Sequence, residues 1–157
     1  MSQEKNTSTL RIPPSFTGVA GEYFVAAELS RRGYIASISL RNARGIDILA
    51  TNQAGSRSIT IQCKTSQDRL NSWMLTEKSE QFFAPNHFYV FVGLGKPNER
   101  PGFHIIPSTT VAKYITKSHR RYLQTFRKDG KRHADTSMRR FEDPNNEYLE
   151  RWDLLGL

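Results

Sequence analysis

Two short apolar segments joined by a polar turn constrain this chain more than any other feature. Residues 45–50 (GIDILA) and 59–64 (ITIQCK) flank a glycine-containing loop. Such a pattern predicts a β-hairpin. Asp47, Gln62 and Lys64 stand at the same end of that hairpin, and strand packing gives no reason for an acid, an amide and a lysine there.

The remaining pattern predicts one α/β domain. In order, we expect a helix over 15–32, strands over 34–40, 46–50 and 58–65, a short helix over 76–83, strands over 87–94 and 103–107, and a helix over 108–123. Ser15 or Thr17 should cap the first helix, and Ser108 the last. This order describes an α/β/α sandwich with a mixed central sheet, whose first three strands form an antiparallel meander.

The first helix carries an apolar face and two interior glycines. We expect that face to consist of Phe16, Val19, Ala20, Tyr23, Phe24, Ala27 and Leu29. Gly18 and Gly21 each cost about 1 kcal/mol relative to alanine inside a helix. A close neighbour would explain them: backbone, a metal, nucleic acid, or simply the sheet packed against the helix. Gly33 supplies the left-handed stop.

The chain has 157 residues, which suits a single domain. We expect 1–14 to be a flexible tail without a secretory signal, 15–157 to be the domain, and 124–147 to be a basic extension on its surface. The segment 148–157 should dock on the core. The single cysteine, Cys63, excludes an internal disulfide framework. With no membrane-length apolar run, this predicts a cytoplasmic protein.

Positive charge is concentrated in one segment. The net charge is +8, and residues 113–140 hold ten Lys or Arg against two acids, so they carry all of it. Such a segment is typical of a protein that binds a phosphate-rich partner, although a merely solvated surface is the alternative. The expected nucleic-acid contacts are Lys113, Lys117, Arg120, Arg121, Arg127, Lys128, Lys131, Arg132, Arg139 and Arg140.

Hairpin register predicts a cation site. Antiparallel pairing places Asp47 beside Gln62 and Cys63, with Lys64 one step further along. The Asp47 carboxylate, the Gln62 amide and a main-chain carbonyl such as that of Cys63 are hard oxygen donors, and Glu22 of the first helix can add a ligand directly or through water. Mg²⁺ suits such a set because it needs only one or two carboxylates plus substrate phosphate. Lys64 would orient a water molecule or neutralise charge on the phosphorus.

These residues resemble the motifs of the PD-(D/E)XK nuclease superfamily. The resemblance rests on Gly21-Glu22, Gly45-Ile46-Asp47 and Gln62-Cys63-Lys64, and is strongest toward restriction-endonuclease-like and archaeal Holliday-junction-resolvase-like members. Its motif part covers 16–66, and 87–106 fits the remaining core strands. It implies a restriction-endonuclease-like αβββαβ core.

The same resemblance implies a function. It describes a Mg²⁺-dependent endonuclease, with Mn²⁺ as a substitute, that hydrolyses phosphodiesters in nucleic acid, expected to be DNA. Asp47 and Gln62 would hold the metal, Lys64 would be catalytic, and Glu22 would assist. The commoner residue at position 62 is Glu. Gln62 keeps an oxygen but removes a negative charge, which should weaken metal affinity.

Other readings stay open at this point. Gln62 would equally suit a catalytically inactive nucleic-acid-binding module on the same fold, and a protein-interaction subunit of a larger restriction or mobile-element system is a third reading. A homodimer is expected by analogy with nucleases that cut two strands. Taken singly, Asp47 could cap a turn and Lys64 could guard a sheet edge.

Several other site types are excluded or disfavoured. The sequence has no Gly-rich phosphate loop, nucleophile elbow or metalloprotease motif. Its four histidines lack ligand spacing, and with one cysteine they argue against structural zinc. His119 and His133 are expected to touch phosphate or solvent. Trp73, Phe82 and Phe83 are candidates to stack on bases, but their apolar neighbourhood favours core packing.

Overall fold

A five-stranded mixed sheet forms the centre of the computed structural model, which describes residues 11–40 and 45–157. The strands are β1 (Ile35–Ile38), β2 (Ile48–Thr51), β3 (Ser58–Ser66), β5 (His87–Gly93) and β6 (Gly102–Pro107), in the order β1-β2-β3-β5-β6. The first three form an antiparallel meander, as predicted. β3 and β5 run parallel, and β6 returns antiparallel to β5. The tail expected over 1–14 lies mostly outside the described residues.

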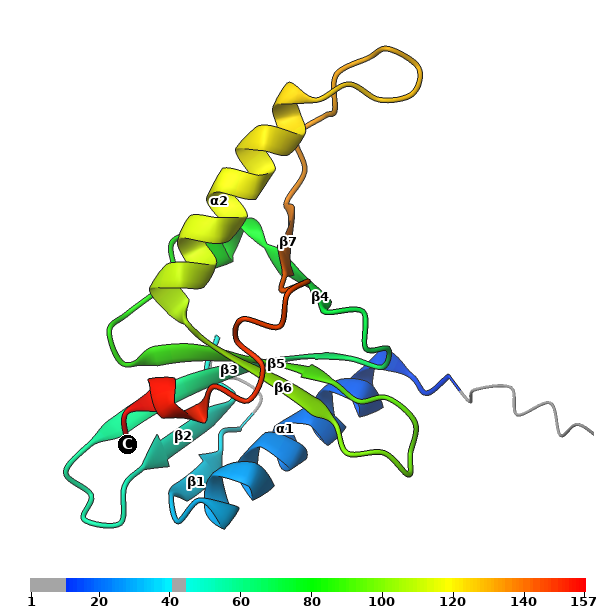
Figure 1. Ribbon diagram of the computed structural model, residues 1–157. Helices are drawn as coiled ribbons and strands as arrows, with labels where there is room; N and C mark the ends of the chain where they lie inside the picture. Colours follow the sequence, from blue (N-terminus) through cyan, green and yellow to red (C-terminus); the bar gives the residue numbers. More distant parts are fainter. Residues whose placement is uncertain (1–10, 41–44) are drawn as a thin grey trace, which may run out of the picture.

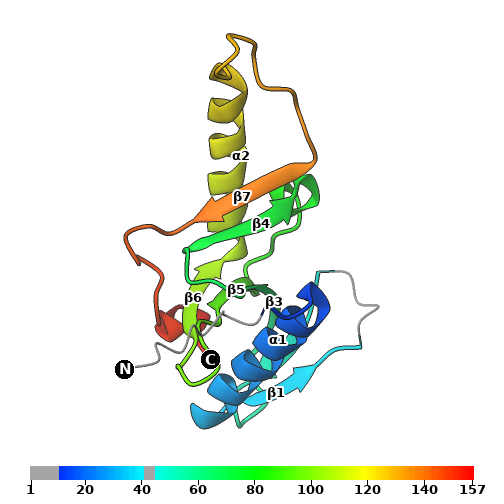
Figure 2. The ribbon, with the colours of Figure 1, turned by 90° about the vertical axis from the view of Figure 1, so that its right-hand side faces the viewer.

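Each face of the sheet is covered by different elements (Figures 1 and 2). Helix α1 (Pro14–Arg31) packs on one face. Helix α2 (Ser108–Gln124) covers the other, together with a two-stranded sheet of β4 (Ser72–Thr76) and β7 (Met138–Glu142). The far end of α2 rises away from the sheet. The layers confirm the predicted α/β/α architecture.

The alternation along β3 divides its side chains between these two faces. Ile59, Ile61 and Cys63 are buried in the core beneath α1. Gln62 and Lys64 point to the opposite face, because neighbouring residues of a strand alternate between faces. All seven residues of β5 are buried, which confirms the prediction of a central strand covered on both faces.

The apolar face predicted for α1 is only partly correct. Thr17, Gly21, Val25, Glu28 and Leu29 are the buried residues. Three aromatic members of the predicted face are exposed instead: Phe16, Tyr23 and Phe24. The helix carries two adjacent apolar stripes, and helical periodicity cannot say which of them meets the sheet.

The local signals of α1 show the same mixture of agreement and difference. The N-cap residue is Pro13, with no side-chain cap, so neither Ser15 nor Thr17 caps the helix as predicted. Gly33 has φ +84°, as its predicted stop requires. Gly21 lies so close to β3 that an added Cβ would come within 1.8 Å of the Thr65 hydroxyl oxygen. Close packing on the sheet therefore explains this glycine.

The segments around α2 depart most from prediction. Residues 67–75 give no clear sequence signal yet hold all of β4 except Thr76. A 3-10 helix, η1 (Glu77–Glu80), lies within the short helix predicted over 76–83. Pro107 is the N-cap residue of α2, so Ser108 does not cap it. The Ser108 hydroxyl instead donates to the Ala84 carbonyl, 3.1 Å away.

The basic segment after α2 also contains an element that sequence missed. β7 forms where a surface loop was expected, and its Phe141 is 1% exposed. The chain then ends in a 3-10 helix, η2 (Trp152–Leu155), whose Trp152 and Leu155 dock on the α1-side core as predicted. Within the described residues, neither helix is long and apolar enough to span a bilayer.

Candidate active site

Asp47 lies where the main-chain pairing of β2 and β3 ends. Its N–H donates to the carbonyl of Ile61 at 2.8 Å. The N–H of Cys63 then donates to Oδ2 of Asp47 at 2.7 Å. A side-chain carboxylate therefore satisfies a strand N–H at the point where the two strands separate.

Asp47 is a cross-strand neighbour of residues 61–63 of β3. The last paired residues are Ile48 and Ile61, and the Asp47 N–H also bonds the Ile61 carbonyl, so the ladder register stops short of Gln62. The Asp47 carboxylate instead accepts from the Cys63 N–H, which places Asp47 beside Cys63 as the hairpin predicts. Gln62 and Lys64 share one face of β3, because they lie two residues apart on the strand.

Gln62 and Lys64 line a recess of about 800 Å³ on the α2 side of the sheet, which we call the catalytic-face recess. Gly45 and Tyr89 line it as well. Residues of β4, η1 and β7 form its other walls. The hairpin thus presents its polar end to a concave surface.

Burial dominates the electrostatics of Asp47. Burial raises the pKa of its carboxyl above the usual value, although the Cys63 N–H and the positive charge of Lys64 each oppose part of this rise. A carboxyl group whose charged form is disfavoured by burial is typical of functional sites.

Glu22 approaches the same stretch of β3 from α1. Its neighbour Gly21 touches Thr65, so the helix lies directly on the strand there. Burial raises the pKa of the Cys63 thiol well above its usual range, and the negative charges of Asp47 and Glu22 add to that rise. Both carboxylates therefore act electrostatically on one residue of β3.

Comparison with solved structures identifies the fold. A Holliday junction resolvase from Archaeoglobus fulgidus matches with a TM-score of 0.51 and 14% identity, over 88% of this chain and 95% of that one. A bacterial homing endonuclease matches with a TM-score of 0.52 and 12% identity, over 93% and 94%. The chain has the restriction-endonuclease-like fold. The sequence matches no protein-family model and no curated protein.

The restriction-endonuclease-like fold here offers a small set of oxygen donors. Within residues 11–40 and 45–157, no three His, Cys, Asp or Glu side chains gather as a metal cluster. A metal held here would depend on Asp47 with the neutral amide of Gln62, supplemented by a main-chain carbonyl and Glu22. This composition fits Mg²⁺, which keeps several waters and takes few protein ligands.

Tyr89 and His87 belong to this face and were missed from sequence. Tyr89 pairs with Gln62 across the parallel β3–β5 ladder. Burial raises the pKa of Tyr89, and the negative charge of Asp47 raises it further. The Ser79 hydroxyl opposes part of this rise, although it is too far away for a hydrogen bond of ordinary length. Burial lowers the pKa of His87 to about 4. Both stand in an apolar strand that predicts only core, so sequence carries no signal for them.

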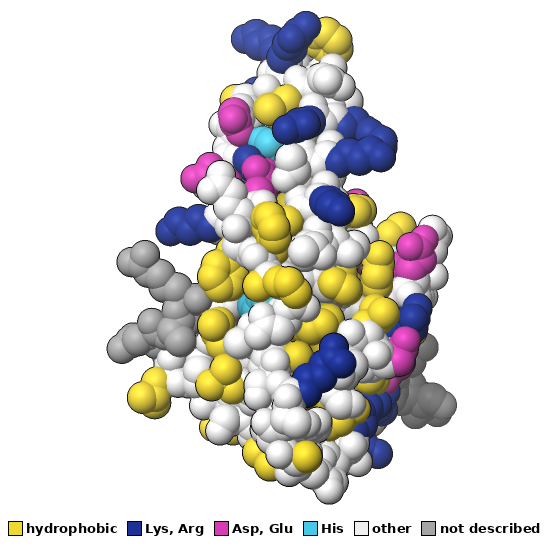
Figure 3. All heavy atoms as spheres, turned by 90° about the vertical axis from the view of Figure 1, so that its left-hand side faces the viewer, with side chains coloured by type: hydrophobic (Ala, Val, Ile, Leu, Met, Phe, Trp, Pro, Cys, Tyr) yellow, Lys and Arg dark blue, Asp and Glu magenta, His cyan; other side chains and the backbone are white. Residues whose placement is uncertain are grey.

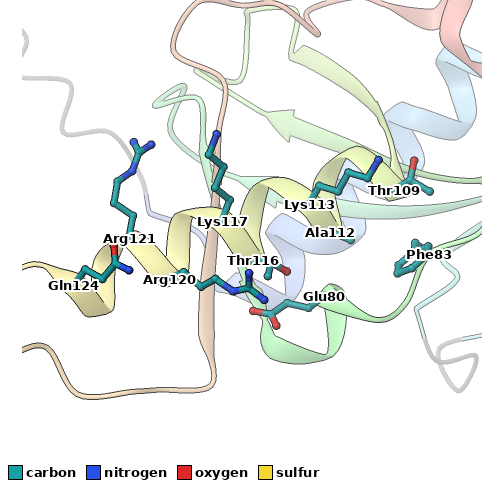
Figure 4. A pocket seen from close by; sticks show the side chains of 10 residues that line it. All are labelled: Glu80, Phe83, Thr109, Ala112, Lys113, Thr116, Lys117, Arg120, Arg121 and Gln124. Atoms are coloured by element: carbon teal, nitrogen blue, oxygen red, sulfur yellow. The ribbon is translucent and has the colours of Figure 1, made fainter.

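The predicted nucleic-acid contacts divide into three groups. Lys113, Lys117, Arg120 and Arg121 are exposed on α2 and line a groove of about 740 Å³, the α2 groove (Figure 4). Arg127, Lys128, Lys131 and Arg132 are exposed on the turn after α2, and Arg140 is exposed on β7. Arg139 is 7% exposed and paired with Glu80, so it is not part of the basic surface.

The histidines hold elements together. His104 and Asp143, both buried, lie 2.6 Å apart and fasten the C-terminal segment to β6. His119 pairs with Asp135 at 2.8 Å, and His133 packs on Tyr122 with ring centroids 4.1 Å apart. Among the described residues, these contacts give His119 and His133 partners other than the phosphate or solvent expected for them.

Proposed function

We propose that this protein is a Mg²⁺-dependent endonuclease that hydrolyses phosphodiester bonds in DNA, with Mn²⁺ able to substitute. The observation that carries the proposal is that the Asp47 carboxylate binds the Cys63 N–H where β2 and β3 separate, between Gln62 and Lys64, which both line the recess. The two similar structures are those of a Holliday junction resolvase and a homing endonuclease, which supports a nucleic-acid substrate.

Each residue has a role set by its chemistry. Asp47 and Gln62 would hold the metal through oxygen atoms, with the Cys63 carbonyl and Glu22 completing the set. When bound, Mg²⁺ supplies a Lewis acid that polarises the phosphodiester. Lys64 would place a positive charge against the oxygens of the scissile phosphate, where negative charge develops. The Tyr89 hydroxyl, kept protonated by burial, is a neutral donor facing the same recess.

The exposed basic residues would hold the substrate backbone. The α2 groove and the turn over 127–132 present lysines and arginines. Such side chains bind nucleic acid in a salt-dependent way, because they release counterions from the phosphates. We also propose a homodimer as the form that cuts both strands, and the cytoplasm as its location. The exposed aromatic residues of α1 support a self-association surface.

A cleavage assay tests this proposal. Duplex, branched and single-stranded DNA are incubated with the protein in Mg²⁺ or Mn²⁺, and products are resolved on gels. Asp47→Ala and Lys64→Ala should each lower the cleavage rate by ~10²-fold or more. Lys96→Ala, an exposed lysine of the β5–β6 turn, is the matched control and should cut normally. Unchanged cleavage by Asp47→Ala or Lys64→Ala would contradict the assignment.

The second candidate is a nucleic-acid-binding module without catalysis. The neutral Gln62 and the lack of a three-acid cluster among the described residues favour it. It predicts salt-sensitive binding of all substrates and no product in either metal. Under the same assay, wild-type protein that binds DNA but never cuts it would select this function.

A further inference from the structure

Two adjacent phenylalanines stand exposed between the catalytic-face recess and the α2 groove. Phe82 is 40% exposed and Phe83 is 53% exposed, on the segment between η1 and β5. Trp73, the third aromatic candidate from sequence, is 3% exposed and belongs to the core. Figure 3 shows hydrophobic side chains gathered across the middle of one face, with lysines and arginines above them. Neighbouring exposed aromatic side chains beside the catalytic-face recess are typical of a binding surface.

Phe82 belongs to the catalytic-face recess. It lines that recess together with Gln62 and Lys64. Its ring meets His87 edge-to-face at 4.9 Å, and an added Cβ on Gly45 would come within 2.8 Å of it. These contacts fix the ring in place and, with it, the course of the chain into Phe83.

Phe83 belongs to the α2 groove. It lines the α2 groove beside Thr109, Ala112 and Lys113. Figure 4 shows Lys113, Lys117 and Arg121 rising from one side of α2, and Phe83 near the start of the helix on the side of Ala112 and Arg120. One step along the chain therefore links the proposed catalytic centre to a row of cations.

Charge in the α2 groove indicates the partner. Four lysines and arginines line it, and its one lining acid, Glu80, is paired with Arg139. A groove that holds both cations and an exposed aromatic ring is suited to a strand of nucleic acid, since the cations bind the phosphates and the ring stacks on a base. In a continuous duplex the faces of the bases are already stacked on one another, so the ring has nothing to contact.

We propose that Phe83 stacks on an unpaired base next to the cut, while Lys113, Lys117 and Arg121 hold the phosphates of the same strand. The substrate class is therefore DNA with unpaired nucleotides at the cleavage point, as in a bulge, a branch or a splayed end. This inference rests on the proposed nuclease function for the identity of the partner, and it adds a preference that the catalytic residues do not give.

Fluorescence anisotropy tests the preference in Ca²⁺, without cleavage. The probes are a duplex with a three-nucleotide bulge and a fully paired duplex of equal length. Wild-type protein should bind the bulged probe ~10-fold more tightly, and Phe83→Ala should lose this preference while it still binds the paired duplex. Phe83→Tyr, which keeps a stacking ring, should retain the preference. Leu70→Ala, which changes an exposed leucine between β3 and β4, is the control and should behave as wild type.

The outcomes separate this inference from the proposed function. Equal binding of both probes by wild-type protein, or a preference that Phe83→Ala keeps, overturns the role of Phe83 and leaves the nuclease proposal standing. No binding of either probe at low salt overturns both. 2-Aminopurine placed in the bulge gives an independent reading, because its emission should be quenched by wild-type protein and not by Phe83→Ala.

Discussion

Glu28 and Asp47 are two carboxylates in the same small domain, held in opposite ways. Glu28 is 6% exposed and accepts hydrogen bonds from Arg31, Arg32 and Arg100 at 2.9, 2.5 and 3.0 Å. Burial alone would raise the pKa of Glu28, but the hydrogen bonds and charges of Arg32 and Arg100 outweigh it and lower the pKa. For Asp47, burial wins and the pKa is raised.

The difference separates a carboxylate whose charge is balanced within the chain from one whose charge is not. Glu28 joins α1 to the β5–β6 turn and, through Arg100, to Glu150 in the C-terminal segment. Every partner it needs is supplied by the chain. Asp47 receives one N–H and the field of one lysine, which do not offset its desolvation. A carboxylate retained at such a site costs stability, and a bound cation would supply the missing charge.

The largest effect should come from removing the paired carboxylate. Glu28→Ala removes the hydrogen bonds that Arg31, Arg32 and Arg100 donate to a buried carboxylate, and should lower the free energy of unfolding by about 3 kcal/mol. Urea denaturation measures it. Glu99→Ala, which breaks an exposed pair with Arg69, should cost less than about 1 kcal/mol. Equal losses in the two variants would show that the Glu28 network has no special weight.

His87 extends the comparison to a buried basic side chain of β5. Its pKa is about 4 in the folded protein and 6.5 ordinarily, so between these pH values His87 is neutral in the folded chain and protonated in the unfolded chain. Stability should be unaffected above pH 6.5 and should fall by about 2 to 3 kcal/mol as pH drops from 6.5 to 4. His87→Gln should flatten this decline in denaturation curves taken across the range. An identical decline in the variant would assign it to other groups.

A smaller effect of opposite sign is expected at Asp47. Because its folded pKa is raised, the ionised carboxyl opposes folding once pH rises through that pKa. Asp47→Asn removes the charge and keeps an oxygen for the Cys63 N–H, so it should stabilise the protein at pH 7 by roughly 1 kcal/mol. The gain should vanish in acid, where Asp47 is protonated. A variant less stable than wild type at pH 7 would show that the charge serves the fold.

Sequence predicted the hairpin well because its signals are local. Alternation along 59–64 and a glycine turn suffice to bring Asp47 to residues 61–63 of β3. It failed at β4 and β7, whose partners lie more than sixty residues apart and whose inward face includes a buried Arg139. The Glu28 network could not be predicted either. Arg100 is 72 residues from Glu28 in the chain, and (i, i+4) spacing identifies only pairs within one helix.

The central claim is that Asp47 stays charged in order to bind a divalent cation, and thermal unfolding in Mn²⁺ or Mg²⁺ tests it without reference to cleavage. At ten times the dissociation constant, metal should stabilise wild-type protein by about 1.4 kcal/mol, which raises the Tm by about 3 to 5 °C. Asp47→Asn should show no saturable rise, and Glu99→Gln should rise as wild type does. An equal rise in wild type and Asp47→Asn, or none in wild type, would contradict the claim.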